Sequence, residues 1–181
     1  LVEAMSRPDR MPQIEVAVGA AQTALLLRHL EPLSVEDHDQ LRRFADAHGV
    51  IWYLQSKGLD SVVLFHPPDA PPLSYELPDF GLQLQFHPTE FTQVNQGVNR
   101  MLVRRAMALL KPGAGERIAD LFCGLGNFTL PIARMGARVL GIEGSPELVK
   151  RAEENAAANG LAAQCEFAVA NLFEMTGESF T

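Results

Sequence analysis

Short apolar runs and longer stretches with helical spacing alternate along the second half of the chain. The apolar runs predict strands, and the stretches between them predict helices that bury one face. The elements expected in this region are strand Arg117–Phe122, helix Asn127–Arg134, strand Ala137–Ile142, helix Pro146–Asn159 and strand Gln164–Val169. Strands that alternate with helices are typical of a parallel sheet. We therefore expect the first half of a doubly wound α/β fold.

Residues 1–90 carry a different pattern, in which short strand-like runs are joined by turns. The strands expected here are Gln13–Val18, Thr23–His29, Val50–Gln55, Ser61–Phe65 and Leu82–Phe86. A helix should begin after Ser34, with Asp37 completing an imperfect capping box, and the prolines of residues 67–72 predict a loop. The pattern predicts a small antiparallel sheet with one helix, forming a central domain over 1–90. A helix over Asn95–Leu110 would then open a second domain, over 91–181.

Composition limits the classes of function. The chain has 181 residues, of which 47% are hydrophobic, and a formal net charge of -7. This charge argues against a large nonspecific nucleic-acid surface, because phosphate binding depends on clustered Lys and Arg. No apolar run is long enough to span a membrane and no signal peptide is visible, so we expect neither membrane insertion nor secretion.

The cysteines and histidines do not predict a metal site. Cys123 and Cys165 are far apart in sequence and match neither a zinc pair nor an iron-sulfur spacing. The histidines include no pair at i and i+4 on one helix. We expect both thiols to be reduced packing residues, and we expect no bound metal.

The turn after the first strand of the second domain has the composition of a nucleotide-binding loop. Gly124 and Gly126 allow the backbone to turn sharply and approach a ligand. Asp120 lies near the end of the strand, where it would either orient the loop through backbone amides or contact a ligand. Phe122 would contribute backbone and ring contacts, or simply core packing, and Asn127 would either cap the next helix or reach the ligand.

Two residues at neighbouring strand ends complete the candidate site. Glu143 ends the second strand, where a carboxylate could accept hydrogen bonds from both hydroxyls of a ribose. Asn171 follows the third strand and should lie beside an adenine edge, with an ordinary turn residue as the alternative. The carboxyl ends of parallel strands meet at one edge of a sheet, so these residues should lie together.

The spacing of the glycines separates two classes of cofactor. A dinucleotide fingerprint needs a third glycine three residues after the second, and Thr129 occupies that position. The run from Asp120 to Phe128 instead resembles motif I of the Rossmann-like S-adenosylmethionine-dependent methyltransferases. We therefore favour S-adenosylmethionine and keep a nicotinamide oxidoreductase as an outside alternative.

Two runs together extend this resemblance to a family. FTQVNQGVN at Phe91–Asn99 and DLFCGLGNFTLP at Asp120–Pro131 closely resemble the RNA uracil-5-methyltransferases, in particular the branch that makes 5-methyluridine in 23S ribosomal RNA. The likeness is strong over Phe86–Phe173 and loose before that. It implies a cofactor site formed by Gln93, Asp120, Phe122, Gly124, Gly126, Asn127, Glu143 and Asn171.

The resemblance also implies what this chain lacks. The family's nucleophilic cysteine lies in a Ser-Cys-Asn-Pro setting after a later strand, and an acidic base lies nearer the C-terminus. Neither motif is present, so no catalytic residue is assigned here, and both groups are expected beyond Thr181. Cys123, inside the cofactor turn, is rejected as nucleophile because the thiol must face the flipped base.

The same resemblance implies the setting of the parent protein. A 4Fe-4S cluster is expected only in a missing upstream region, since the cysteines that would bind it are not in this chain. A full sheet of this class would need several more strands beyond Thr181. The chain is thus interpreted as an inactive fragment of a cytoplasmic enzyme that acts on ribosomal RNA.

Two further alternatives stay open. The chain could be part of a methyltransferase of the same cofactor class that acts on a small molecule or a protein. It could also be a noncatalytic binding module, in which an open sheet edge pairs with a second copy.

Overall fold

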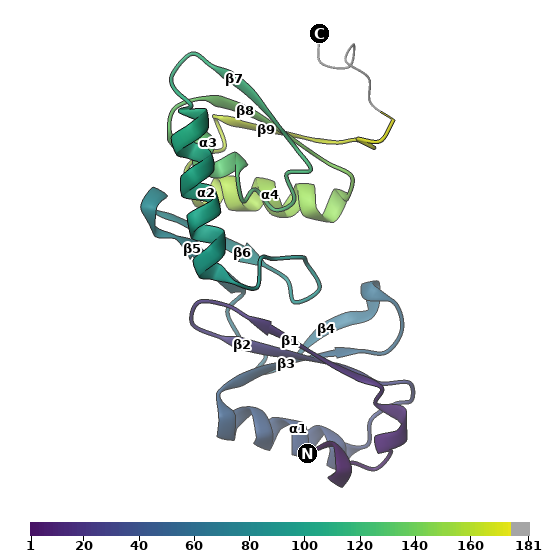
Figure 1. The fold of residues 1–181 in the computed structure, drawn as a ribbon. Helices are drawn as coiled ribbons and strands as arrows, with labels where there is room; N and C mark the ends of the chain where they lie inside the picture. The colour runs from purple at the N-terminus through teal and green to yellow at the C-terminus, as the bar shows by residue number, and fades with distance from the viewer. Residues whose placement is uncertain (175–181) are drawn as a thin grey trace. The chain divides into compact units, whose positions relative to one another are not determined.

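The computed structural model describes residues 1–174, which form two compact units (Figure 1). The N-terminal unit contains Leu1–Ser74 together with His87–Thr89. The C-terminal unit contains Tyr75–Phe86 and the described residues from Glu90 onward. The predicted end of the second domain, Thr181, lies outside the described residues, so this boundary stays a prediction.

The N-terminal unit is a four-stranded sheet with one helix packed on a face. Its elements are η1 (Val2–Ala4), η2 (Pro8–Arg10), β1 (Gln13–Val18), β2 (Thr23–Arg28), α1 (Val35–His48), β3 (Val50–Gln55), η3 (Leu59–Ser61) and β4 (Val62–His66). The strand order is β1-β2-β3-β4. Leu27, Leu41, Trp52 and Leu54 form the centre of the core between α1 and the sheet. The predicted strands and helix are confirmed to within a residue or two at their ends.

The prediction that this sheet is antiparallel is wrong for one pair of strands. β1 pairs with β2, and β3 with β4, in antiparallel fashion, but β2 and β3 run parallel. The cause is α1, which lies between β2 and β3 in sequence and carries the chain back to the other end of the sheet. The helix itself begins as expected, because Ser34 and Asp37 form a full reciprocal capping box.

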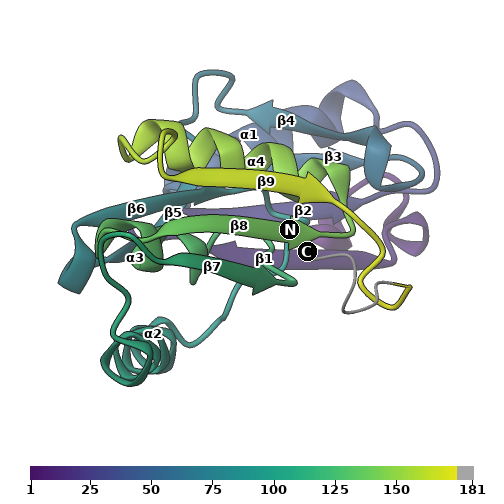
Figure 2. The same cartoon turned by 90° about the horizontal axis from the view of Figure 1, so that it is seen from above.

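The C-terminal unit contains a three-stranded parallel sheet. Its main elements are α2 (Gln96–Leu110), β7 (Arg117–Leu121), α3 (Thr129–Arg134), β8 (Arg138–Glu143), α4 (Pro146–Ala158) and β9 (Cys165–Val169). Figure 2 shows β7, β8 and β9 side by side and pointing the same way, in agreement with their parallel pairing. The strand order advances in one direction, so right-handed crossovers place α3 and α4 on the same face. The predicted strand and helix order is confirmed.

A pair of short strands precedes this sheet and was only half predicted. β5 (Leu73–Leu77) and β6 (Leu82–Phe86) pair with each other, with η4 (Pro78–Phe80) between them. So short a connection requires an antiparallel hairpin. β6 matches the expected strand, whereas β5 was missed because its sequence follows a proline-rich loop without clear alternation.

Two asparagines of the α4 segment bind the outer edge of this hairpin. Asn155 accepts a hydrogen bond from the amide of Gln85 at 2.8 Å and donates to its carbonyl at 3.1 Å. Asn159, the C-cap of α4, does the same with the amide and carbonyl of Gln83, at 3.1 and 2.7 Å. Four helical residues rise about 6 Å, and two strand residues span about 6.8 Å. The spacing of the two side-chain amides therefore matches alternate backbone groups of β6.

These contacts explain a difference from the predicted domain boundary at residue 90. The prediction assigned the whole of Leu82–Phe86 to the first domain, but Tyr75–Phe86 belongs to the C-terminal compact unit. Docking of β6 on α4 by asparagine side chains cannot be foreseen from hydrophobic periodicity. Across residues 1–174, no helix has the combined length and apolarity of a membrane span.

Candidate cofactor site

The glycine-rich loop lies at the carboxyl end of β7 and is folded tightly on itself. The amide of Cys123 donates to the carbonyl of Ile142 on β8 at 3.1 Å, and the amide of Gly126 donates to the carbonyl of Cys123 at 3.0 Å. Three residues of the loop have positive φ: Phe122 (60°), Gly124 (55°) and Gly126 (100°). The helix that follows begins at Thr129, two residues later than predicted.

The two glycines serve different purposes. A Cβ atom placed on Gly124 would meet no other atom within 4 Å, so the space above this residue is open. A Cβ atom on Gly126 would lie 3.2 Å from Cγ of Leu130. Packing and the backbone angle therefore both disfavour a larger residue at Gly126, whereas Gly124 combines a left-handed backbone with room for a ligand.

Glu143 lies against this loop, as predicted. Its Oε2 accepts a hydrogen bond from the amide of Gly124 at 3.1 Å. Its Oε1 accepts from the amides of Gly144 at 2.8 Å and Ser145 at 3.2 Å. An ionised carboxylate has about four lone-pair positions, so one position, on Oε2, remains for a ligand hydroxyl. The predicted proximity is confirmed, and ribose binding stays a prediction.

Asp120 acts on the loop through the first residue of α3. Its Oδ2 accepts a hydrogen bond from the hydroxyl of Thr129 at 2.6 Å. Burial raises the pKa of Asp120, although hydrogen bonds from the side chain and backbone of Thr129 act in the opposite direction. Thr129 is fully buried. The position that a dinucleotide fingerprint gives to glycine is thus occupied by a hydroxyl that binds the preceding strand.

The side chain of Asn127 is already bound on both sides. Its Oδ1 accepts hydrogen bonds from the hydroxyl of Tyr75 and from Nδ2 of Asn99, both at 2.9 Å. Its Nδ2 donates to Oδ1 of Asn99 at 2.9 Å. A turn of Asn127 toward a ligand would leave buried polar groups unpaired, at about 1–3 kcal/mol each. Of the alternatives for this residue, the geometry favours a structural one, and ligand contact stays a prediction.

Two aromatic rings lie at the same edge of the sheet. The ring of Phe122 is 5.6 Å from that of Phe173, centroid to centroid, and both side chains are exposed. A bulky residue in the left-handed region costs about 1–2 kcal/mol, and such strain is concentrated at functional sites. Asn171 is exposed and accepts a hydrogen bond from the amide of Phe173 at 3.2 Å, so it also shapes the turn after β9.

Gln93 is the predicted residue that the structure does not bring to the loop. It is exposed in the segment before α2, and within residues 1–174 no hydrogen bond joins it to the glycine turn. Its assignment depends on the family resemblance alone and stays a prediction.

The two thiols have no catalytic geometry. Cys123 and Cys165 are both buried and unpaired with each other. Burial, reinforced by the nearby carboxylates of Asp120 and Glu143, raises the pKa of Cys123 to about 12. Burial raises the pKa of Cys165 to about 11. A thiol with such a pKa stays protonated at neutral pH and is a poor nucleophile.

No catalytic residue was assigned within the chain, because the nucleophilic cysteine and the base were expected beyond Thr181. The described residues end at 174, so the structure does not test where the nucleophile and the base lie, and this expectation stays a prediction. The part of the chain that the structure describes also contains no cluster of His, Cys, Asp and Glu suited to a metal ion.

Sequence reasoning missed three residues that support the loop. Tyr75 and Asn99 bind Asn127, and Asn155 donates from Nδ2 to the carbonyl of Leu125 at 3.1 Å. All three side chains are buried. A signal for the asparagines is present in the sequence: each occupies an inward-facing position of a helix, among the buried residues Val103 and Met107 of α2 or Ala152 and Ala156 of α4.

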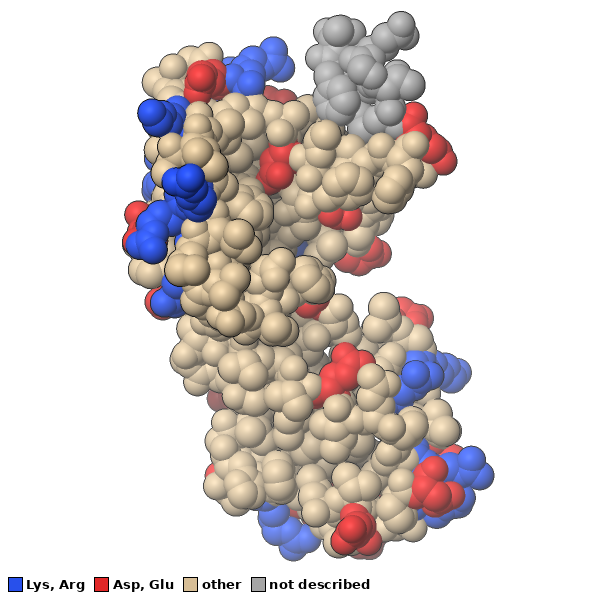
Figure 3. Space-filling view, in the orientation of Figure 1, with Lys and Arg blue, Asp and Glu red and all other residues tan. Residues whose placement is uncertain are grey.

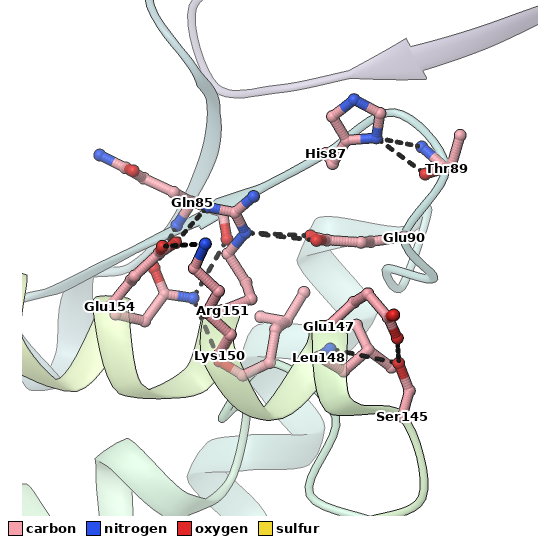
Figure 4. A network of polar contacts seen from close by, with 12 residues as sticks. Gln85, His87, Thr89, Glu90, Ser145, Glu147, Leu148, Lys150, Arg151 and Glu154 are labelled. Carbon is pink, nitrogen blue, oxygen red and sulfur yellow. Dashed lines mark hydrogen bonds and ion pairs between the residues drawn. The ribbon is translucent and has the colours of Figure 1, made fainter. Parts of the chain in front are cut away.

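Charged groups near the site are organised around α4 and α2. Arg151 of α4 lies between two carboxylates (Figure 4). Its Nε is 3.3 Å from Oε1 of Glu90, and its Nη1 is 2.6 Å from Oε2 of Glu154. Figure 3 shows Lys and Arg side chains over α2, which carries Arg100, Arg104 and Arg105 and no acidic residue. This helix is a local basic surface on a chain that is acidic as a whole.

Comparison with known proteins gives matches over 99% of the chain. A protein-family model described as a methyltransferase domain matches residues 112–181. The 23S rRNA (uracil(1939)-C(5))-methyltransferase RlmD of Dechloromonas aromatica (strain RCB) is 58% identical over 179 residues, which are 99% of this chain and 41% of that protein. The protein of the same name from Azoarcus sp. (strain BH72) is also 58% identical, with the same coverage. The chain spans about two fifths of the length of these curated relatives.

A solved structure with a similar fold is the tRNA (uracil-54, C5)-methyltransferase of Pyrococcus abyssi, crystallised with S-adenosyl-L-homocysteine. The TM-score is 0.66 at 21% identity, and the match covers 90% of this chain and 40% of that one. At this identity the likeness shows the fold alone. The expected fold class, an α+β portion followed by part of a Rossmann-like methyltransferase sheet, is confirmed.

Proposed function

Because this chain is homologous, over 99% of its length, to part of the 23S rRNA uracil-C5-methyltransferases, we propose that it holds the front half of an S-adenosylmethionine site. The intact protein would methylate carbon 5 of a uridine in 23S ribosomal RNA. The names of the curated relatives specify uracil 1939, and we propose the same position. The 58% identity to these proteins is the observation that carries the proposal.

The residues of the loop fit the proposed cofactor. The space above Gly124 is open, and Oε2 of Glu143, next to it, retains capacity for a hydroxyl. When bound, S-adenosylmethionine would supply an electrophilic methyl group at this edge of the sheet. An acceptor-only carboxylate beside an exposed backbone turn suits an adenosine better than an anionic ligand.

Each predicted residue then has a proposed role. Glu143 would accept a hydrogen bond from a ribose hydroxyl, and Asn171 would lie at the adenine edge. Phe122 would border the methionine end, and Gln93 would reach the cofactor from the segment before α2. Asp120 would keep the loop in place through Thr129.

Calorimetric titration tests the cofactor class. The chain should bind S-adenosylhomocysteine and should not bind NAD. Binding of NAD alone would favour the oxidoreductase alternative, and binding of neither compound would contradict the proposed site.

The 181-residue chain should not transfer a methyl group by itself. The reaction requires a thiolate that adds to carbon 6 of uracil, and a base that later removes the proton from carbon 5. Both thiols of this chain are buried, with pKa values raised to about 12 and about 11. Incubation with tritiated S-adenosylmethionine and unmodified 23S ribosomal RNA should label the RNA with the intact protein only. Labelling by the 181 residues would overturn this proposal.

The proposed partner of the intact protein is ribosomal RNA in the cytoplasm. The net charge of -7 suggests that most phosphate contacts lie outside this chain, with the basic surface of α2 as a local exception. Any 4Fe-4S cluster would need cysteines outside this chain, because Cys123 and Cys165 are the only two and both are buried.

Self-association is a separate proposal for the isolated chain. Within the described residues β7 pairs with β8 alone, which leaves one edge of β7 unpaired. Sedimentation over a range of concentrations should reveal a dimer, and a monomer at every concentration would contradict it.

A further inference from the structure

The glycine loop is held by side chains that come from outside its own strand and helix. Asn127 is bound by Asn99 of α2 and Tyr75 of β5, through three hydrogen bonds of 2.9 Å. These side chains are buried: Asn99 is 4% exposed and Tyr75 is 6% exposed. The two side-chain amides of Asn99 and Asn127 face each other and satisfy each other reciprocally, which fixes their orientation.

A second anchor reaches the loop from α4. Nδ2 of Asn155 donates to the carbonyl of Leu125 at 3.1 Å and to the carbonyl of Gln85 at 3.1 Å. Its Oδ1 accepts from the amide of Gln85 at 2.8 Å, and the residue is 1% exposed. One buried side chain therefore ties the loop to β6, and both of its amide hydrogens are used in doing so.

The positions of the two anchors explain why they are needed. Leu125 and Asn127 flank Gly126, whose φ of 100° no other residue type adopts readily. Glycine is also the residue with the most freedom when it is not held. A loop that contains Gly124 and Gly126 would sample many shapes, and a ligand would have to select one of them at a cost in affinity. Anchors on both sides of Gly126 reduce this freedom before a ligand arrives.

We propose that Tyr75, Asn99 and Asn155 are positioning residues that hold the Gly124–Asn127 loop in its cofactor-binding shape. Tyr75 of β5 and Asn99 of α2 then support the cofactor site, although neither strand β5 nor helix α2 belongs to the parallel sheet. This inference rests on the proposed binding of S-adenosylmethionine at that loop.

Titration of the chain with S-adenosylhomocysteine tests the inference. Tyr75→Phe removes one hydrogen bond and should weaken binding by about fivefold. Asn99→Ala and Asn155→Ala should each weaken it by about tenfold or more. Asn159→Ala is the matched control, because Asn159 docks the same hairpin on the same helix but does not contact the loop. Its dissociation constant should stay within about twofold of the wild-type value.

Hydrogen exchange without ligand gives a second readout. The amides of residues 125–128 should exchange faster in Tyr75→Phe and Asn155→Ala than in the wild type, and at an unchanged rate in Asn159→Ala. The proposal is overturned if the wild type binds S-adenosylhomocysteine and the variants Tyr75→Phe, Asn99→Ala and Asn155→Ala all bind it equally well. If the wild type itself does not bind, the proposed function fails, and the exchange rates alone then decide whether these residues order the loop.

Discussion

The carboxylate of Glu143 and the backbone of Gly124 are joined by a hydrogen bond, with Oε2 3.1 Å from the amide nitrogen. The end of β8 thereby holds the loop after β7, and the same oxygen retains capacity for a ligand hydroxyl. Glu143 is thus part of the loop's own structure as well as the proposed ribose acceptor.

Glu143→Gln should weaken the binding of S-adenosylhomocysteine by about tenfold or more. Glutamine has a single acceptor oxygen, so its NH2 group must face either Gly124 or the amides of Gly144 and Ser145. The measurement is calorimetric titration. Glu166→Gln is the control, because this substitution changes the charge by the same amount at an exposed position of β9. Equal affinities for the two variants would contradict the assignment.

Alanine at the two loop glycines should give unequal losses of stability. Gly124→Ala should cost about 1–2 kcal/mol, because its φ of 55° disfavours a Cβ atom but the surrounding space is open. Gly126→Ala should cost more, since its Cβ atom would also press on Leu130. Urea unfolding followed by circular dichroism measures both. Trp52, the single tryptophan, lies in the core of the N-terminal unit, so its fluorescence reports on that unit rather than on the glycine loop. Equal losses at the two positions would be inconsistent with the packing at Gly126.

Asp120→Asn should make the protein more stable at neutral pH, by an amount that shrinks in acid. Burial raises the pKa of Asp120 above its ordinary value of 3.8, so the folded state binds the proton more tightly than the unfolded state. The carboxylate therefore costs stability above the folded pKa, and this cost disappears as the pH falls below the unfolded value. Asparagine still offers an oxygen to Thr129. The urea midpoints of the wild type and Asp120→Asn, measured between neutral pH and about pH 4, give the difference in stability between the two proteins. A difference that does not change with pH would refute the argument.

The two acidic partners of Arg151 should contribute unequally. The side chain of Glu90 is 12% exposed and that of Glu154 is 46% exposed. Glu90→Gln should cost about 1 kcal/mol, since the charged hydrogen bonds are shielded from water. Glu154→Gln should cost less than about 0.5 kcal/mol, as is usual for an exposed pair on one helix. The free energies of unfolding of the two variants and of Arg151→Met test this order. A larger loss for Glu154→Gln would reverse the interpretation.

Much of the fold follows from local patterns. The apolar run Val50–Leu54, with Gln55 after it, forms β3 with the predicted bounds, and Ser145 and Pro146 begin α4 as expected. These elements depend on residues close together in sequence. The glycine turn and Glu143 could also be placed together, because parallel strands deliver their ends to one edge.

The missed features all depend on contacts between distant residues. Leu73–Leu77 becomes a strand only because β6 pairs with it, and β2 and β3 run parallel only because α1 returns the chain. The sequence offers two roles for Asn127, as a helix cap or as a residue that contacts the ligand. In the structure, Tyr75 and Asn99 bind its side chain instead. Periodicity identifies the face that a helix buries, and it does not say which polar group a buried asparagine meets.

The pair of asparagines on α4 has a consequence for solubility during folding. A strand with unsatisfied outer amides and carbonyls is a template on which another polypeptide can grow a sheet. Asn155 and Asn159 occupy those groups at Gln85 and Gln83, so α4 ends the β5–β6 ribbon as an extra strand would, yet offers no new edge. Without both side chains, the outer edge of β6 would have unsatisfied backbone groups, and a strand of another molecule could add to it.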